Sequence, residues 1–126
     1  MLKLLSLTAF ASIFVAGAAF AAEPASPAPV AKNGMFVTAK GMTLYTFDKD
    51  SAGKSACNGP CATNWPPALA VDDAKPIGPW TIVARDDGLK QWAYNGKPVY
   101  AFAKDTKAGD TTGDGFLNGA WHIAKP

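Results

Sequence analysis

The sequence predicts a small all-β domain, an antiparallel fold built from two duplicated hairpin-loop units with a pseudo-twofold relation. Three observations support this prediction. A ten-residue stretch at 41–50 recurs at 96–105, with five identical positions at a constant offset of 55 residues, which indicates an internal duplication. The most apolar segments alternate or are rich in aromatic and β-branched residues, as strands are. No segment repeats apolar residues at the period of a helix.

The repeated stretch contains a Tyr-x-Phe-x-x-Asp motif that predicts a strand followed by a turn. Residues i and i+2 share one face of a strand, so Tyr and Phe present two rings to one side, while the preceding Leu44 or Val99 points to the other. The Asp is expected to organise a turn by accepting backbone N–H bonds. Alternatively, the Tyr and Asp side chains line a ligand site between the two units. The motif residues are Tyr45, Phe47 and Asp50 in the first copy, and Tyr100, Phe102 and Asp105 in the second.

The first 21 residues predict a signal peptide that is removed on export. Lys3 precedes an apolar run at 4–15 that is too short to span a bilayer comfortably, and residues 19–21 match the small-x-small cleavage pattern. Residues 22–33 are rich in Pro and Ala and are predicted to be an extended linker that does not pack. The sequence therefore predicts a protein of the periplasm or the extracellular space, with no membrane span in the mature chain.

Residues 34–126 are predicted to form one two-repeat β domain, with repeats at about 34–67 and 80–126. Asn95-Gly96 predicts a tight hairpin turn, because both residues tolerate positive φ. Segments 68–79 and 103–119 show no strand pattern and are expected to be an irregular crossover and a long loop. Besides the two motif strands, the expected strands are residues 36–39, 80–85, 90–94 and 120–124.

Composition and motifs argue against several function classes. The chain has 12 basic and 10 acidic side chains, which is too balanced for binding nucleic acid by bulk electrostatics. It has one His and lacks a nucleophile elbow, a phosphate-binding Gly loop and a His-Glu-x-x-His zinc pattern. We therefore expect a monomer that is not an enzyme and whose partner is a protein or a small ligand. A small hydrolase acting through Asp50 and Asp105 is the enzymatic alternative.

Cys57 and Cys61 are the only cysteines, and they lie in one short loop. In an exported protein this arrangement predicts a structural disulfide, which contributes about 2 kcal/mol in the chain-entropy estimate for so small a loop. This interpretation requires no cofactor. The alternative is a copper-binding or thiol-redox module, in which two thiolates and the imidazole of His122, the only His, would suit copper.

Three carboxylates, Asp105, Asp110 and Asp114, lie in one Gly-rich loop. Their spacing does not match the EF-hand pattern, in which ligands stand at positions 1, 3 and 5 and a Glu at position 12. We therefore expect a solvated, turn-forming loop, with a weak calcium site as the alternative.

In combination these features resemble a family of bacterial secreted proteins and predicted lipoproteins with a repeated Tyr-x-(Phe/Trp/Tyr)-x-x-Asp motif. The resemblance covers about residues 34–126. It includes Cys-x-x-x-Cys with Asn-Trp-Pro-Pro at 57–67, Gln-Trp-x-Tyr-Asn-Gly-Lys-Pro at 91–98, and Gly-Asp-x-x-Gly-Asp-Gly ending in Trp-His at 109–122. The chain lacks the lipidation Cys of the lipoprotein branch. The resemblance implies a periplasmic or cell-surface module whose biochemical role is unassigned, and we predict binding or scaffolding.

Overall fold

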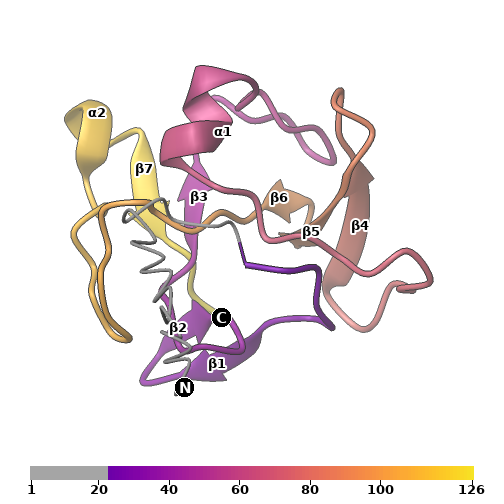
Figure 1. Ribbon diagram of the computed structural model, residues 1–126, viewed down its shortest axis with the longest axis horizontal. Helices are drawn as coiled ribbons and strands as arrows, with labels where there is room; N and C mark the ends of the chain where they lie inside the picture. The colour runs from indigo at the N-terminus through magenta and orange to yellow at the C-terminus, as the bar shows by residue number, and fades with distance from the viewer. Residues whose placement is uncertain (1–22) are drawn as a thin grey trace, which may run out of the picture.

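The computed structural model describes residues 23–126, which form small antiparallel sheets and two short helices (Figure 1). In chain order the elements are β1 (Val30–Lys32), β2 (Met35–Val37), β3 (Tyr45–Phe47), α1 (Pro60–Asn64), β4 (Trp80–Ala84), β5 (Lys90–Tyr94), β6 (Lys97–Pro98), α2 (Phe116–Gly119) and β7 (Trp121–Ile123). The sheets of this part of the chain pair β1 with β2, β3 with β7, and β4 with β5 and β6 in that order. The all-β prediction is confirmed. The signal peptide expected at residues 1–21 lies outside the described residues.

Two hairpins use the same turn chemistry. Asn95 and Gly96 join β5 to β6, and both have positive φ, at 48° and 82°. The predicted Asn-Gly turn is therefore confirmed. Asn33 and Gly34 join β1 to β2 with φ values of 53° and 78°, so an equivalent turn opens the first unit.

The structure differs from the linker prediction for residues 22–33. Val30–Lys32 forms β1 and pairs with β2, and Ser26 forms a β-bridge with Ala70. The indole of Trp92 also donates a hydrogen bond to the Ser26 carbonyl at 2.9 Å. The prolines end at residue 29, so the backbone N–H groups that follow are free to pair.

The two units exchange their last strands. β3 of the first unit pairs with β7 of the second unit, and the two lie side by side in Figure 1. Equivalently, Ala101 N donates to Pro66 O at 2.8 Å and Ala68 N donates to Val99 O at 3.0 Å, so the end of the first unit pairs with the motif strand of the second. Each motif strand is thus completed by the other unit.

The pseudo-twofold axis passes between Tyr45 and Tyr100. The backbone N–H of each residue donates to the carbonyl of the other, with N–O distances of 2.7 Å and 2.9 Å. Together with the strand exchange, this reciprocal pair confirms the predicted pseudo-twofold relation.

Two hydrophobic clusters lie on opposite faces of the motif strands. Leu44 and Val99 are fully buried in a cluster with Phe36, Trp80 and Trp92. The motif rings face the other way, as the period-two pattern predicts. Their cluster consists of Tyr45, Cys57, Trp65, Tyr100, Phe102 and Trp121, with Phe47 packed against it.

The helix α1 lies just before Trp65, outside the segments expected to be irregular, whereas α2 lies in segment 103–119, which was expected to be a long loop. They contain five and four residues, which is too short to show a helical period in the sequence. Each precedes a buried Trp of the motif cluster, Trp65 after α1 and Trp121 after α2. Pro66 follows Trp65 and restricts its backbone, so α1 ends there.

Candidate functional site

The motif Tyr and Asp side chains form two crossed pairs between the units. Tyr45 Oη donates to Asp105 Oδ2 at 2.7 Å, and Tyr100 Oη donates to Asp50 Oδ2 at 2.6 Å. Burial raises the pKa of both phenols, and the hydrogen bond to the carboxylate raises each further. Both tyrosines therefore remain protonated donors at neutral pH.

The second oxygen of each motif Asp organises the loop that follows it. Asp50 Oδ1 accepts the backbone N–H of Ala56 at 2.7 Å, and Asp105 Oδ1 accepts that of Thr112 at 3.0 Å. Each Asp thus accepts a backbone N–H bond, as expected for a turn. The donor, however, lies six or seven residues along the chain, so each Asp organises a longer loop. Burial raises the pKa of Asp50, against the effect of the hydrogen bonds from Tyr100 and Ala56.

The crossed pairs leave little of the motif open to a ligand. Tyr45, Tyr100 and Asp105 are at most 1% exposed. Asp50 alone among these four reaches the wall of a surface hollow. The hydroxyl and carboxylate groups of the pairs are directed at each other, so their arrangement joins the two units.

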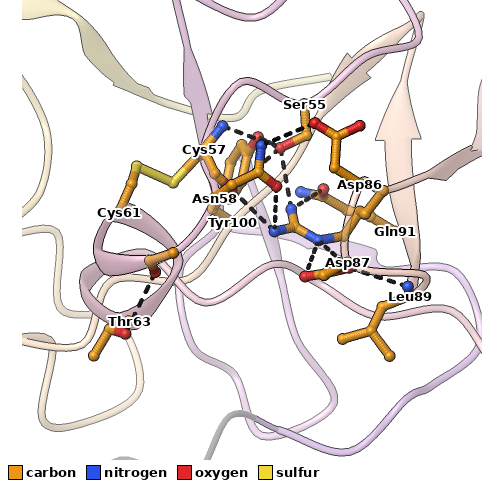
Figure 2. Close-up of polar contacts among 12 residues, drawn as sticks. Ser55, Cys57, Asn58, Cys61, Thr63, Asp86, Asp87, Leu89, Gln91 and Tyr100 are labelled. Carbon is orange, nitrogen blue, oxygen red and sulfur yellow. Dashed lines mark hydrogen bonds and ion pairs between the residues drawn. A yellow bond between two sulfur atoms is a disulfide. The ribbon is translucent and has the colours of Figure 1, made fainter.

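A buried arginine, Arg85, extends one crossed pair into a network; Figure 2 shows Ser55, Gln91 and Tyr100 of this network. Tyr100 Oη lies 2.6 Å from Ser55 Oγ, and Arg85 Nη1 donates to Ser55 Oγ at 3.0 Å and to Gln91 Oε1 at 2.8 Å. Arg85 Nε also forms an ion pair with Asp87 at 3.0 Å. A buried guanidinium is tolerated because these oxygens satisfy its donors.

Sequence reasoning missed Arg85, Ser55 and Gln91. A usable signal was present for two of them, because Arg85 and Gln91 share the period-two phase of the buried Val83 and Ala93. Because both residues are polar, the alternation of apolar residues did not indicate that their positions are buried. Ser55 lies in a loop and carried no such signal.

The predicted disulfide between Cys57 and Cys61 is present, with a Cα–Cα distance of 5.2 Å. The Cys57 carbonyl accepts a hydrogen bond from Arg85 Nη2 at 2.9 Å. The disulfide loop of the first unit is therefore attached to the second unit through Arg85.

His122 lies apart from the disulfide chemistry in this structure. Its Nε2 is 2.8 Å from Asp48 Oδ2, and both side chains are about half exposed. Among residues 23–126, no three His, Cys, Asp or Glu side chains are grouped closely enough to hold a metal ion. The candidate copper ligands Cys57, Cys61 and His122 are therefore not brought together.

The carboxylates of the Gly-rich loop also remain separate. Asp105 is buried in its crossed pair, and Asp110 Oδ2 accepts the backbone N–H of Thr106 at 2.9 Å. Asp114 Oδ1 accepts the N–H of Ile123 at 3.3 Å. The three carboxylates thus bond different backbone groups, two of them in the loop and one in β7.

A polar groove begins at the His122–Asp48 pair. A hollow of about 540 Å³ lies between β3, β7 and the β5–β6 turn. A second hollow of about 250 Å³ continues it past the same turn, because the two share four lining residues. We call the two together the polar groove; its main side chains are Thr46, Asp48, Tyr94, Asn95, Lys97 and His122.

Two segments of the chain, residues 30–69 and 81–125, match the model of a family described as a secreted repeat of unknown function. The chain belongs to this secreted-repeat family. The two matches agree with the two units seen in the structure and confirm the resemblance inferred from the motif. No curated protein and no solved structure is significantly similar to the chain.

Membership of the secreted-repeat family describes an exported module without naming its activity. Among residues 23–126, no helix has the length and apolarity needed to cross a bilayer. In this secreted-repeat protein, each motif Tyr bonds the Asp of the other copy, so the crossed pairs require two copies of the motif. The polar groove touches these pairs only at Asp50 and remains the candidate binding site.

Proposed function

We propose that the protein is a monomeric, non-catalytic binding or scaffolding module of the periplasm or cell surface, and that the polar groove binds a small polar ligand or a short polar peptide segment. The observation that carries this proposal is the contrast between the groove and the motif. The motif Tyr and Asp groups bond to each other, whereas the groove presents charged side chains to solvent.

The chemistry of the groove suits polar recognition. Lys97 and Lys125 line it with ammonium groups, and Asn95 adds an amide. Asp48 is paired with His122, so the carboxylate orients the imidazole while one ring nitrogen remains for a ligand. The ring of Tyr94 forms an apolar wall against which a ligand can pack.

A binding experiment tests the groove directly. Backbone amide shifts of the protein are followed by NMR during titration with carboxylates, phosphate, short saccharides and short peptides. We expect one class to shift Asn95, Lys97 and His122 together. Lys97→Ala is expected to weaken that binding roughly tenfold, as loss of one charge-assisted hydrogen bond does.

Lys40→Ala is the matched control, because Lys40 is exposed and lies outside the groove. Equal loss of binding in both variants would contradict a groove-specific site. Conversion of the bound compound during long incubation would contradict the non-catalytic part of the proposal while leaving the binding site intact.

A second candidate is the thiol-redox or copper module, and one observation favours it. Cys61 is only partly buried and lines an apolar surface recess, so a reductant could reach its sulfur. Reduced protein would then offer two thiolates near this recess. Thiol counting and copper stoichiometry before and after mild reduction test the candidate. A disulfide that survives mild reduction would count against this candidate, and so would a reduced protein that binds no copper.

A further inference from the structure

Four aromatic rings stack in one column through the centre of the protein. Trp65 and Trp121, one from each unit, lie face to face with centroids 3.7 Å apart and an interplanar angle of 3°. Phe47 stacks on Trp121 at 4.2 Å, and Phe102 stacks on Trp65 at 4.0 Å. The column therefore connects the two units in a continuous path of π contacts.

Both motif tyrosines abut the indoles of this column. Tyr45 lies edge-on to Trp65 with centroids 5.5 Å apart, and Tyr100 lies edge-on to Trp121 at 5.2 Å. Each phenol in turn donates to a carboxylate. The resulting sequence of contacts is Asp105, Tyr45, Trp65, Trp121, Tyr100 and Asp50.

The protonation chemistry differs between the indoles and the phenols. Trp121 Nε1 is buried and has no hydrogen-bond partner among the described residues, so an oxidised Trp121 has no protein group to accept its proton. An oxidised phenol is a strong acid, and the carboxylates lie 2.7 Å and 2.6 Å from the oxygens of Tyr45 and Tyr100. A positive hole on the indole is therefore expected to move to a tyrosine.

The phenols cannot supply an electron as ready-made phenolates. Burial raises the pKa of Tyr45 and of Tyr100, so both keep their protons at neutral pH. Loss of an electron and transfer of the proton to the carboxylate must then occur together.

An apolar recess of about 260 Å³ lies beside the indoles. Trp65, Trp121 and Phe102 line it, and Phe116 and Leu117 form its rim. Leu117 is 59% exposed and has a left-handed backbone with φ of 53°, a conformation that is strained for a branched residue. The indoles themselves are at most 3% exposed. The recess therefore brings a small molecule close to the edge of Trp65, while Trp121 stays covered, and it excludes a folded protein.

We propose that this assembly is a one-electron relay whose substrates are small oxidising radicals. The oxidant gains one electron from Trp65 or Trp121. The indole radical cation regains its electron from Tyr45 or Tyr100, and the phenolic proton passes along the existing hydrogen bond to Asp105 or Asp50. The products are the reduced oxidant, a neutral tyrosyl radical and a carboxylic acid. A one-electron donor then restores the phenol, which recovers its proton from the acid.

Pulse radiolysis with azidyl radical tests this relay in the full-length exported protein, because azidyl oxidises indoles first. The conversion of the resulting tryptophan radical into a tyrosyl radical can then be followed by absorbance. The chain has three tyrosines, and Tyr94 belongs to the other cluster. We expect first-order conversion, independent of protein concentration, in the wild type and also in Tyr94→Phe, in which Tyr45 and Tyr100 are the remaining tyrosines. Loss of conversion in Tyr94→Phe overturns the proposal.

The double variant Tyr45→Phe with Tyr100→Phe is expected to lose the conversion while retaining the Trp radical. Unchanged conversion in a folded double variant overturns the proposal. If this variant does not fold, the Tyr94→Phe protein supplies the decisive measurement in deuterated solvent. There, proton transfer to the carboxylate predicts slower conversion than in ordinary water, and identical rates in the two solvents overturn the proposal. This relay does not require ligand binding in the polar groove, which it meets only at Asp50.

Discussion

Tyr45 and Asp105 come from different copies of one repeat and meet at 2.7 Å in the buried centre of the protein. The reciprocal pair of Tyr100 and Asp50 meets at 2.6 Å. A single unit would leave both its Tyr hydroxyl and its Asp carboxylate without these partners. The duplication is therefore required by hydrogen bonding as well as by the area that each unit can bury.

The first prediction concerns the energetic ranking of the tyrosine hydroxyls. Tyr45→Phe removes the partner of a carboxylate oxygen in a residue that is 1% exposed, and we expect it to lower the free energy of unfolding by about 2 kcal/mol. Tyr100→Phe should cost less, because Asp50 borders the polar groove and can bind water there. Urea unfolding measures both values.

Tyr94→Phe is the control for this ranking, since its hydroxyl forms no hydrogen bond within residues 23–126 and its ring packs against Phe36 and Trp80. It should change stability by less than about 0.5 kcal/mol. Equal stability of Tyr45→Phe and Tyr94→Phe would show that the crossed pair contributes nothing to stability.

The second prediction is a loss of stability at alkaline pH. Burial raises the pKa of Tyr45 and Tyr100 above the ordinary value of 10.0. Above pH 10.0 the unfolded chain ionises these phenols while the folded chain keeps them protonated, so the free energy of unfolding falls as pH rises. Chemical unfolding across this range, with phenolate absorbance recorded in parallel, measures the effect.

Two of the three phenols should ionise only together with unfolding. In the double variant Tyr45→Phe with Tyr100→Phe, the alkaline decline should become shallower. A phenolate signal from all three tyrosines in a protein that remains folded would contradict the assignment.

The third prediction concerns Arg85. Arg85→Met removes the donor to Ser55, Gln91 and the Cys57 carbonyl and leaves these buried acceptors with fewer partners. We expect a loss of about 3 kcal/mol in the free energy of unfolding, as for breaking a buried charged network. The disulfide should also be reduced faster by dithiothreitol, because its loop loses an anchor to the second unit.

Lys90→Met is the matched control for Arg85, since Lys90 is exposed on β5 and its ammonium group donates to the Asp72 carbonyl alone in the part of the chain that the structure describes. Its stability should stay within about 0.5 kcal/mol of the wild type. If the free energy of unfolding falls equally in both variants, the loss comes from removing a positive charge, and the buried network of Arg85 does not contribute to stability.

The fourth prediction tests the packing beneath the aromatic column. A Cβ on Gly113 would lie 2.7 Å from Trp65 Cη2 and 3.0 Å from Phe102 Cδ2, so the rings must shift. Gly113→Ala should cost about 2 kcal/mol through overpacking and should alter the near-ultraviolet circular dichroism of the stacked indoles. Thr111→Ala, at an exposed neighbouring site, should leave the spectrum unchanged.

Local chemistry made much of the architecture predictable. The alternation of Leu44 and Tyr45 indicated which face each would occupy, and Asn95-Gly96 indicated its turn, because these features depend on neighbouring residues. The disulfide of Cys57 and Cys61 was predictable for the same reason. β1 was missed because its three residues follow a proline-rich stretch and bury little surface.

The sequence by itself determined the strand class, the duplication, the small disulfide loop and membership of a secreted-repeat family. Only the tertiary structure decided that each Tyr bonds the Asp of the other unit, across 60 and 50 residues of chain. The tertiary structure also decided that Arg85 is buried where the two units meet. It also decided where the polar groove lies. Such partners are brought together by strand exchange about an axis, and no local pattern records which copy of a repeated motif will face which.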